Sequence, residues 1–173
     1  RVADPRRSIR TDRMPSDLRE LALEALDSHT SRERTRAFSA GDIRIYPYLS
    51  RWQAARGETG GRKDRPVCVA LPLRKNDVTH LFLLAITSTR PAADRIALEI
   101  PEIEARRGGL KGWKQGWVLV DECNYDIAER SFHFDRTEPV LGRFSETFTE
   151  CIKAELRVAI GAGTLRQVDR TAD

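Results

Sequence analysis

Two apolar runs that end in polar side chains contain the residues best suited to bind an anion. Arg65 stands directly before one run, and Thr87 and Ser88 end the other. Both runs have strand length, and the polar segment 74–77 between them fits the turn of a hairpin. The start of one antiparallel strand lies beside the end of the next. We therefore expect Arg65 close to Thr87 and Ser88, in a candidate anion site at one rim of the core.

The segment 50–64 is a second candidate surface. It is long, contains three glycines and carries five basic or aromatic residues: Arg51, Trp52, Arg56, Arg62 and Lys63. Loops of this length without secondary structure are uncommon unless they are functional or disordered. A flexible basic loop with an exposed tryptophan suits contact with the backbone and bases of single-stranded nucleic acid. The alternative, a solvated loop with Trp52 folded back on the core, stays open.

Composition limits the class of protein without naming a ligand. The chain has 173 residues, 40% of them hydrophobic and 32% charged, which fits one domain with an appendage and a heavily charged surface. The net charge of +4 permits a polyanionic partner but does not require one. No apolar run has membrane-spanning length, and no signal peptide is visible, so we expect a cytoplasmic protein with no membrane partner.

The three cysteines predict neither a disulfide framework nor a zinc site. Cys68, Cys123 and Cys151 are widely spaced and include no Cys-x-x-Cys pair, a usage typical of reduced thiols in a cytosolic protein. Cys68 and Cys151 lie in apolar patterns, and we expect both in the core. The sequence has no glycine-rich phosphate loop and no dinucleotide fingerprint, so we expect no cofactor and no metal.

The hydrophobic patterns predict a mainly β fold. Beyond the hairpin we expect strands at 43–46, 96–100, 117–121 and 132–134, with 102–116 as a connection. A closing amphipathic helix over 145–160 has a buried stripe with a period of four, and Thr147 and Glu150 have the spacing of a capping box. Short strands, long loops and one helix indicate a small antiparallel barrel capped by that helix.

An additional helix is predicted at 16–26, after an arginine-rich arm. Its apolar residues fall on one side, which favours a surface helix docked on the domain; a partner-binding or dimerising helix is the alternative. His29 follows this helix and suits a partner for its C-terminal dipole. We divide the chain into an N-terminal arm and helix at 1–39, a barrel domain at 40–163 and a tail at 164–173.

The order of these motifs resembles the MazF/PemK (Kid) toxins of type II toxin–antitoxin systems. Gly41-Asp42-Ile43 opens a strand, a long basic loop follows, and Lys63-Asp64-Arg65-Pro66-Val67 enters the next strand. Ile86-Thr87-Ser88 ends a strand, Val120-Asp121 follows a Trp-Val-Leu strand, and a helix closes the match, which covers roughly 40–160. The resemblance implies an SH3-like barrel, a homodimer and a metal-independent endoribonuclease that cuts single-stranded RNA. It also implies an antitoxin whose tail occupies the RNA groove.

The chemistry of such a reaction can be matched to residues. Attack of a ribose 2′-hydroxyl on its own phosphate needs positive charge, hydrogen-bond donors and proton transfer at both ends. By resemblance, Arg65 is the catalytic arginine and Thr87 the strand-end hydroxyl, with Ser88 as a neighbouring donor and Asp121 as the matching carboxylate. A surface Arg65 paired with Asp64 or Glu99 is the alternative. Three further residues complete the expected RNA-binding set with the loop at 50–64: Arg44, His80 and Arg90.

One position departs from the family pattern. Some relatives carry a catalytic arginine two positions before the aspartate, and Leu119 stands there in this chain. Either Arg65 supplies the charge alone, or Arg44, His80 or Arg90 compensates, or the barrel is a non-catalytic RNA- or protein-binding module. A gyrase poison similar to CcdB ranks last, because the closing helix ends without a tryptophan.

Overall fold

The protein has a mainly β fold in a computed structural model that describes residues 13–28, 37–135 and 137–171. The described residues form four helices and eight strands. The helices are α1 (Ser16–Asp27), α2 (Arg51–Ala55), α3 (Glu102–Arg107) and α4 (Glu146–Ala162). The strands are β1 (Asp42–Tyr46), β2 (Arg65–Lys75), β3 (Val78–Thr87), β4 (Ala97–Glu99), β5 (Trp117–Leu119), β6 (Glu122–Ile127), β7 (Gly142–Arg143) and β8 (Arg166–Asp169).

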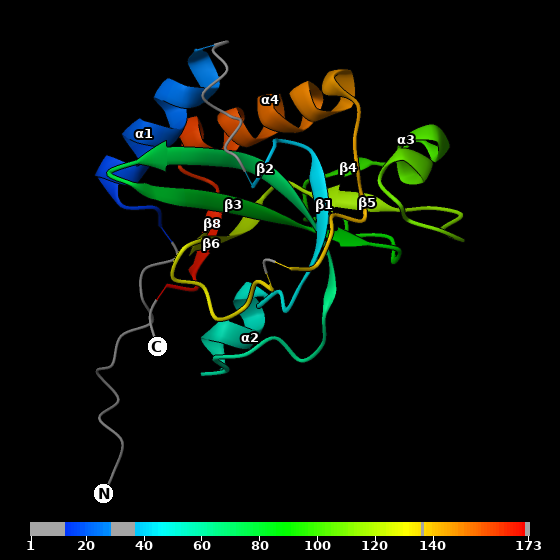
Figure 1. The fold of residues 1–173 in the computed structure, drawn as a ribbon, viewed down its shortest axis with the longest axis horizontal. Coiled ribbons are helices and arrows are strands. Elements are labelled where there is room, and N and C mark those ends of the chain that lie inside the picture. Colours follow the sequence, from blue (N-terminus) through cyan, green and yellow to red (C-terminus); the bar gives the residue numbers. More distant parts are fainter. Residues whose placement is uncertain (1–12, 29–36, 136, 172–173) are drawn as a thin grey trace, which may run out of the picture.

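One curled sheet forms a half-barrel, as Figure 1 shows. Its main path runs β4-β5-β3-β2-β1-β7, and β6 also pairs with β3 and carries β8 on its other edge. Strand β3 is central, because β2 lies on one side of it while β5 and β6 share the other. Every strand pair is antiparallel except β6–β8.

The predicted hairpin is the longest element pair of the sheet. Lys75 pairs with Val78, so the connection is the two-residue turn Asn76-Asp77. Both turn residues have positive φ, 54° and 62°, which a two-residue hairpin loop requires and which Asn and Asp tolerate best after Gly. The hairpin is therefore confirmed, with its turn at the end of the molecule opposite to Arg65.

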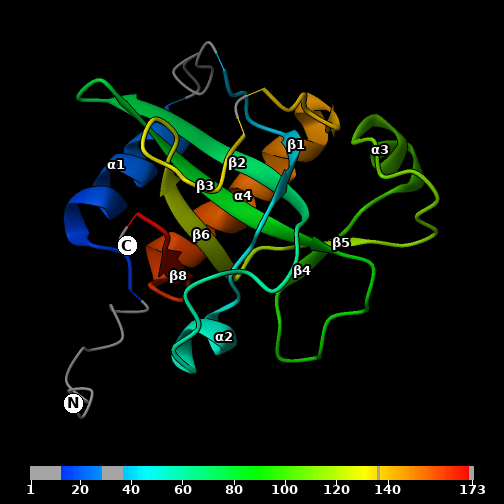
Figure 2. The same ribbon diagram turned by 60° about the horizontal axis from the view of Figure 1, so that its bottom comes forward.

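A first hydrophobic core lies between the sheet and the helices α1 and α4. Figure 2 shows α4 crossing behind β2 and β3. The expected α4 stripe is confirmed, since Ile152, Leu156 and Ile160 are buried. The helix begins where it was predicted, but its cap differs: Ser145 is the N-cap and accepts a hydrogen bond from the Phe148 backbone N–H at 3.2 Å, two residues before Thr147.

Helix α1 contributes Leu18, Ala22 and Ala25 to the first core and packs against α4 and β2. Arg19 ties it to the end of α4 through hydrogen bonds to the carbonyl oxygens of Ile160 and Gly161 at 3.1 and 2.9 Å. This arrangement agrees with the predicted docked helix. His29 and residues 1–12 lie outside the described residues.

A second core covers the opposite face of the sheet. It contains Tyr46, Val67, Leu83 and Ala85, and Phe134 packs against it. Side chains of neighbouring strands share this face when they are cross-strand partners, as Val67 and Ala85 are. The candidate anion site lies at the margin of this second core.

Several details of the sequence prediction were wrong. The segment 164–173 is not a tail, because it contains β8 and the buried Arg170. Strand β6 was not predicted, and 132–134 is not a strand. The segments 50–64 and 102–116 contain α2 and α3. Cys151 is exposed, because it precedes the buried Ile152 by one residue and a helix turns by 100° per residue.

Candidate functional site

Residues from five strands form a row along one end of the sheet. Glu99 pairs with Trp117, Trp117 pairs with Thr87, and Tyr46 pairs with Arg65. The last register pair of β2 and β3 at this end is Val67–Ala85; Arg65 precedes Val67 by two residues, and Thr87 follows Ala85 by two. Since side chains alternate along a strand, Arg65 and Thr87 lie on the same face as that pair. The fold thus brings Arg65 and Thr87 to one rim, on adjacent strands.

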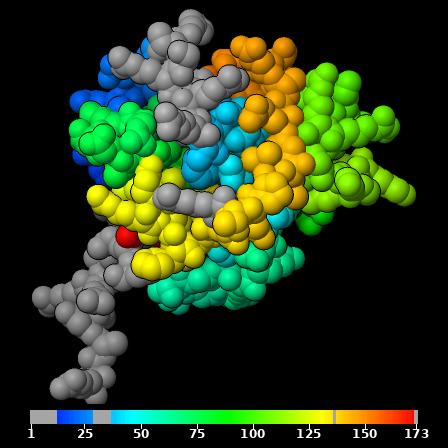
Figure 3. All heavy atoms as spheres, viewed as in Figure 1, coloured from blue at the N-terminus to red at the C-terminus, as the bar shows by residue number. Residues whose placement is uncertain are grey.

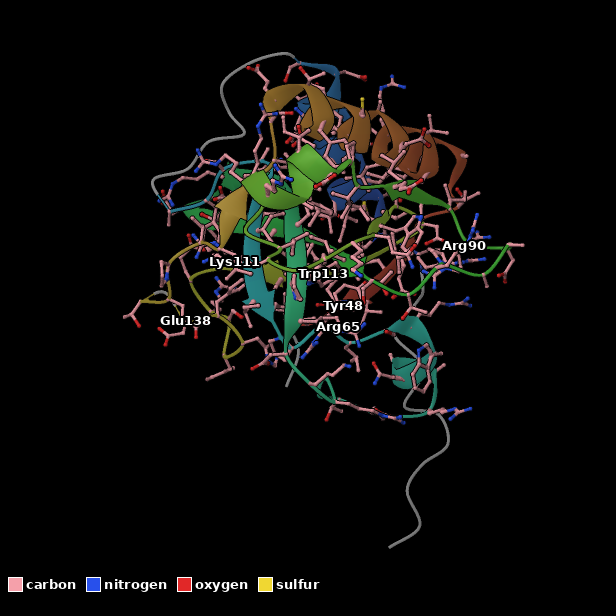
Figure 4. The ribbon with its side chains drawn as sticks, turned by 90° about the vertical axis from the view of Figure 1, so that its right-hand side faces the viewer. Tyr48, Arg65, Arg90, Lys111, Trp113 and Glu138 are labelled. Atoms are coloured by element: carbon pink, nitrogen blue, oxygen red, sulfur yellow. The ribbon has the colours of Figure 1, made fainter. Side chains whose placement is uncertain are left out.

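Arg65 is partly buried and makes no ion pair within 4 Å to any described residue, so the expected alternative pairing with Asp64 or Glu99 is not present. Its Nε is buried, and among the described atoms it has no hydrogen-bond partner. A buried donor without a partner costs free energy that a bound acceptor recovers. Figure 4 shows Arg65 below Tyr48 at this end of the sheet.

Thr87 and Ser88 form the turn that leaves β3. The Thr87 hydroxyl accepts a hydrogen bond from the Thr89 backbone N–H at 3.1 Å, which is a local turn contact. Ser88 is exposed. The Thr87 hydroxyl also donates to the Thr89 carbonyl oxygen at 3.4 Å, a long contact that it would give up to donate to a ligand.

Asp121 is held by a residue that the sequence did not single out. Arg95 binds both carboxylate oxygens, with Nε at 2.8 Å from Oδ2 and Nη2 at 2.8 Å from Oδ1. Oδ2 also accepts from the Ile96 backbone N–H at 3.1 Å. Burial raises the pKa of Asp121, but these hydrogen bonds outweigh it and leave the pKa below its ordinary value. Asp121 therefore fastens the loop after β3 to the end of β5.

Glu122 extends this cluster into the protein. Its Oε1 accepts from the hydroxyl of the fully buried Tyr48 at 3.0 Å, and Arg95 Nη2 lies 3.6 Å from its Oε2. Burial raises the pKa of Glu122, and Arg95 and the Tyr48 hydroxyl only partly offset that effect. Burial, followed by the Glu122 charge, raises the pKa of Tyr48 as well, so this hydroxyl stays protonated.

Leu119 lies on the same face of the sheet as Arg65 and Thr87. It lies two residues after Trp117 on β5 and packs against the second core, so it shares the face of Thr87. The position at which the resembling family carries an arginine therefore faces the same side as Arg65. In this chain that position is apolar and contributes packing.

The basic segment 50–64 contains a short helix and is not a loop throughout. Helix α2 begins after Ser50, which forms a capping box with Gln53. Trp52 is 48% exposed, so it is not folded back on the core. Its ring lies 5.3 Å from the guanidinium of Arg56 and 4.8 Å from that of Arg62, and Arg62 in turn bonds Glu58. Arg51 and Lys63 are exposed in the same segment.

The three other predicted RNA-binding residues differ in position: His80 lies apart from the rim, Arg44 packs on a buried ring, and Arg90 is exposed. His80 is seven residues before Thr87, about 23 Å along β3, and its Nδ1 is 2.6 Å from the Tyr125 hydroxyl. Arg44 covers the Phe38 ring at 4.5 Å and donates to the Ala37 carbonyl. Arg90 is exposed in the loop after β3, to the side of Arg65 in Figure 4.

Some features of the site had no sequence signal. Arg95 is one of many arginines in the chain, and only the fold brings it to Asp121. Trp117 and Glu99 read as ordinary strand residues until their pairing places them in the row. The Ser50–Gln53 capping box did have a signal, the Ser-x-x-Gln spacing.

The described residues contain no group of three or more His, Cys, Asp or Glu side chains arranged to hold a metal ion. Among the helices described, none combines the length and apolar character needed to cross a membrane. No known protein family, curated protein or solved structure matches the chain.

Proposed function

We propose that this chain is a metal-independent endoribonuclease of the MazF/PemK (Kid) toxin type that cuts single-stranded RNA and thereby inhibits growth. One observation carries the proposal: Arg65, with a buried and unbonded Nε, and Thr87 stand on adjacent strands and on one face, where Ser88 is exposed. A guanidinium beside hydroxyl groups is suited to bind a phosphodiester.

The reaction follows from the chemistry of these groups. The ribose 2′-oxygen passes its proton to solvent water and attacks the adjacent phosphorus, and the bond to the 5′-oxygen breaks as that oxygen takes a proton from water. The products are a 2′,3′-cyclic phosphate and a 5′-hydroxyl end. Arg65 stabilises the additional negative charge of the transition state, and the Thr87 and Ser88 hydroxyls donate to its oxygens. Asp121, bound to Arg95, positions the loop after β3 and does not contact the phosphate.

The proposal has consequences for fold and partners. In this proposal the half-barrel is an SH3-like barrel and the protein is a homodimer. A cognate antitoxin covers the groove that binds RNA. Trp52 and the arginines around it contact the RNA strand, with base stacking on Trp52 requiring one guanidinium to move aside.

A non-catalytic RNA-binding module is the second candidate. It is favoured by Leu119, an apolar residue on the face of the rim, and by the engagement of Asp121 with Arg95. Gyrase poisoning is less favoured, because α4 ends at Ala162 without a tryptophan and the chain continues into β8.

The test is incubation with a long single-stranded RNA in excess EDTA. The wild type should give fragments that end in cyclic phosphate. Arg65→Ala should lower the rate by about 100-fold or more, the size of effect seen when one transition-state donor is removed, and Arg65→Lys should recover part of it. Arg130→Ala, which removes an exposed arginine after β6, is the matched control. Binding without cleavage supports the second candidate, and cleavage that survives Arg65→Ala contradicts the role of Arg65.

A further inference from the structure

A cleft of about 670 Å³ lies between α3 and the segment that follows it, outside the rim that contains Arg65. We call it the Trp113 cleft. Figure 3 shows the segment around 100–116 projecting from one side of the molecule, and Figure 4 shows Lys111 and Trp113 next to α3. Its volume is within the range of small-ligand sites. Its lining residues are Glu102, Ala105, Arg106, Leu110, Lys111, Gly112, Trp113 and Lys114.

Trp113 is held in place by contacts with the first core and with Gly116. Trp113 packs against the first core, and a Cβ added to Gly116 would be 3.0 Å from its Cε3. The absence of a side chain at Gly116 therefore makes room for the indole. Trp113 is only partly buried, so some of its ring remains accessible from the cleft.

Positive charge surrounds this ring. Lys111 and Lys114 are exposed, and within the described part of the chain neither makes an ion pair within 4 Å. Arg106 is paired with Glu102 at 2.6 Å, and both side chains are more than 70% exposed. Three cations against one carboxylate leave the cleft with a net positive charge.

We propose that the Trp113 cleft binds one nucleotide of a single-stranded nucleic acid. The indole stacks on the base, while Lys111 and Lys114 bind the neighbouring phosphates. An acidic peptide would satisfy the lysines but has no planar group for the ring, so the tryptophan favours the nucleotide.

The position of the cleft fits a strand that also reaches the rim. Gly116 adjoins Trp117, which pairs with Thr87. Trp113 and Trp117 are four residues apart, at most about 14 Å between their Cα atoms. The inference deepens the proposed function: the cleft holds a base that flanks the cleaved phosphodiester.

The experiment uses a fluorescein-labelled mixed-sequence DNA oligonucleotide, which lacks the 2′-hydroxyl and measures binding without cleavage. Trp113→Ala should weaken binding by about 5- to 150-fold, the value of one stacked base. Trp113→Leu, which keeps apolar contacts to the first core, should weaken it similarly, while Trp113→Phe should weaken it less. Lys111→Ala combined with Lys114→Ala should reduce the slope of log affinity against log salt by about 1.4. Circular dichroism of each variant checks that the variant is folded.

Two control variants keep their affinity. Phe132→Ala removes an aromatic ring that is 86% exposed in the turn after β6, and Lys75→Ala removes an exposed lysine at the hairpin turn. Unchanged affinity in Trp113→Leu overturns the cleft inference even if the wild type cleaves RNA, and the proposed function then stands. Weakened affinity in a protein that cleaves no RNA supports the cleft and contradicts the ribonuclease. Binding of polyglutamate that is insensitive to Trp113→Ala overturns the choice of a nucleotide.

Discussion

Arg95 and Asp121 form a two-point ion pair in which Nε and Nη2 each lie 2.8 Å from a different carboxylate oxygen. The pair connects the loop after β3 to the end of β5. Arg95 Nη2 also lies 3.6 Å from Oε2 of the buried Glu122. A carboxylate held by an arginine and a backbone N–H has little capacity to accept a proton near neutral pH. This contact assigns Asp121 to the support of the site.

Asp121→Asn should lower the free energy of unfolding by about 1.5–3 kcal/mol, because it weakens charged hydrogen bonds to Arg95 in a partly buried place. Urea unfolding measures the change. Glu102→Gln is the matched control, since its pair with Arg106 is exposed and worth at most about 1 kcal/mol. Full stability combined with lost RNA cleavage would show instead that Asp121 acts in the reaction.

Glu104 should make stability depend on pH. Its carboxylate accepts from the Ser145 backbone N–H and hydroxyl at 2.8 and 2.6 Å and from Arg107 at 2.8 Å, which joins α3 to the start of α4. Burial raises the pKa of Glu104, but these hydrogen bonds outweigh it, and the pKa is below its ordinary value. A lowered pKa means that the contribution is present above the unfolded value, about 4.3, and is lost as the pH falls below it.

Glu104→Gln should therefore cost about 1–3 kcal/mol at pH 7 and much less at pH 3. Urea unfolding at both pH values measures the two differences. Glu24→Gln, on the exposed side of α1, should change neither. An equal loss at both pH values would mean that Glu104 contributes by packing and not by its charge.

The thiols should differ in reactivity. Burial raises the pKa values of Cys68 and Cys123, whereas Cys151 is exposed on α4. The thiolate is the reactive form. A thiol-reactive chromogenic disulfide should modify one cysteine of the folded protein quickly and all three after unfolding. Cys151→Ser should abolish the fast phase, and a fast phase that persists would place another cysteine at the surface.

Ala22→Glu should destabilise the protein by about 2–4 kcal/mol, because Ala22 is fully buried between α1 and the first core. Thermal and urea unfolding measure the loss. Oligonucleotide affinity of the folded variant should stay unchanged, since α1 packs on the face of the sheet opposite to Arg65. Glu20→Ala, on the exposed side of α1, is the control. Weakened affinity would connect α1 to the binding surface.

Local patterns predicted the elements that depend on nearby residues. The hairpin followed from two apolar runs around a turn, and the α4 stripe followed from its period of four. Cys151 was misplaced because a stripe defined by every fourth residue says little about its neighbours. Strand β8 was missed because a four-residue strand is stabilised by pairing with β6, 44 residues earlier, and not by its own sequence.

The candidate site also has a part that could be predicted from the sequence and a part that could not. The sequence by itself determined that Arg65 and Thr87 would lie at one rim, because antiparallel pairing within one hairpin brings the start of β2 to the end of β3. Only the tertiary structure decided that Arg95 holds Asp121, that Trp117 and Glu99 continue the row, and that α1 packs away from the rim. Those contacts join segments distant along the chain, and their geometry is set by the curl of the whole sheet and by the burial of both of its faces.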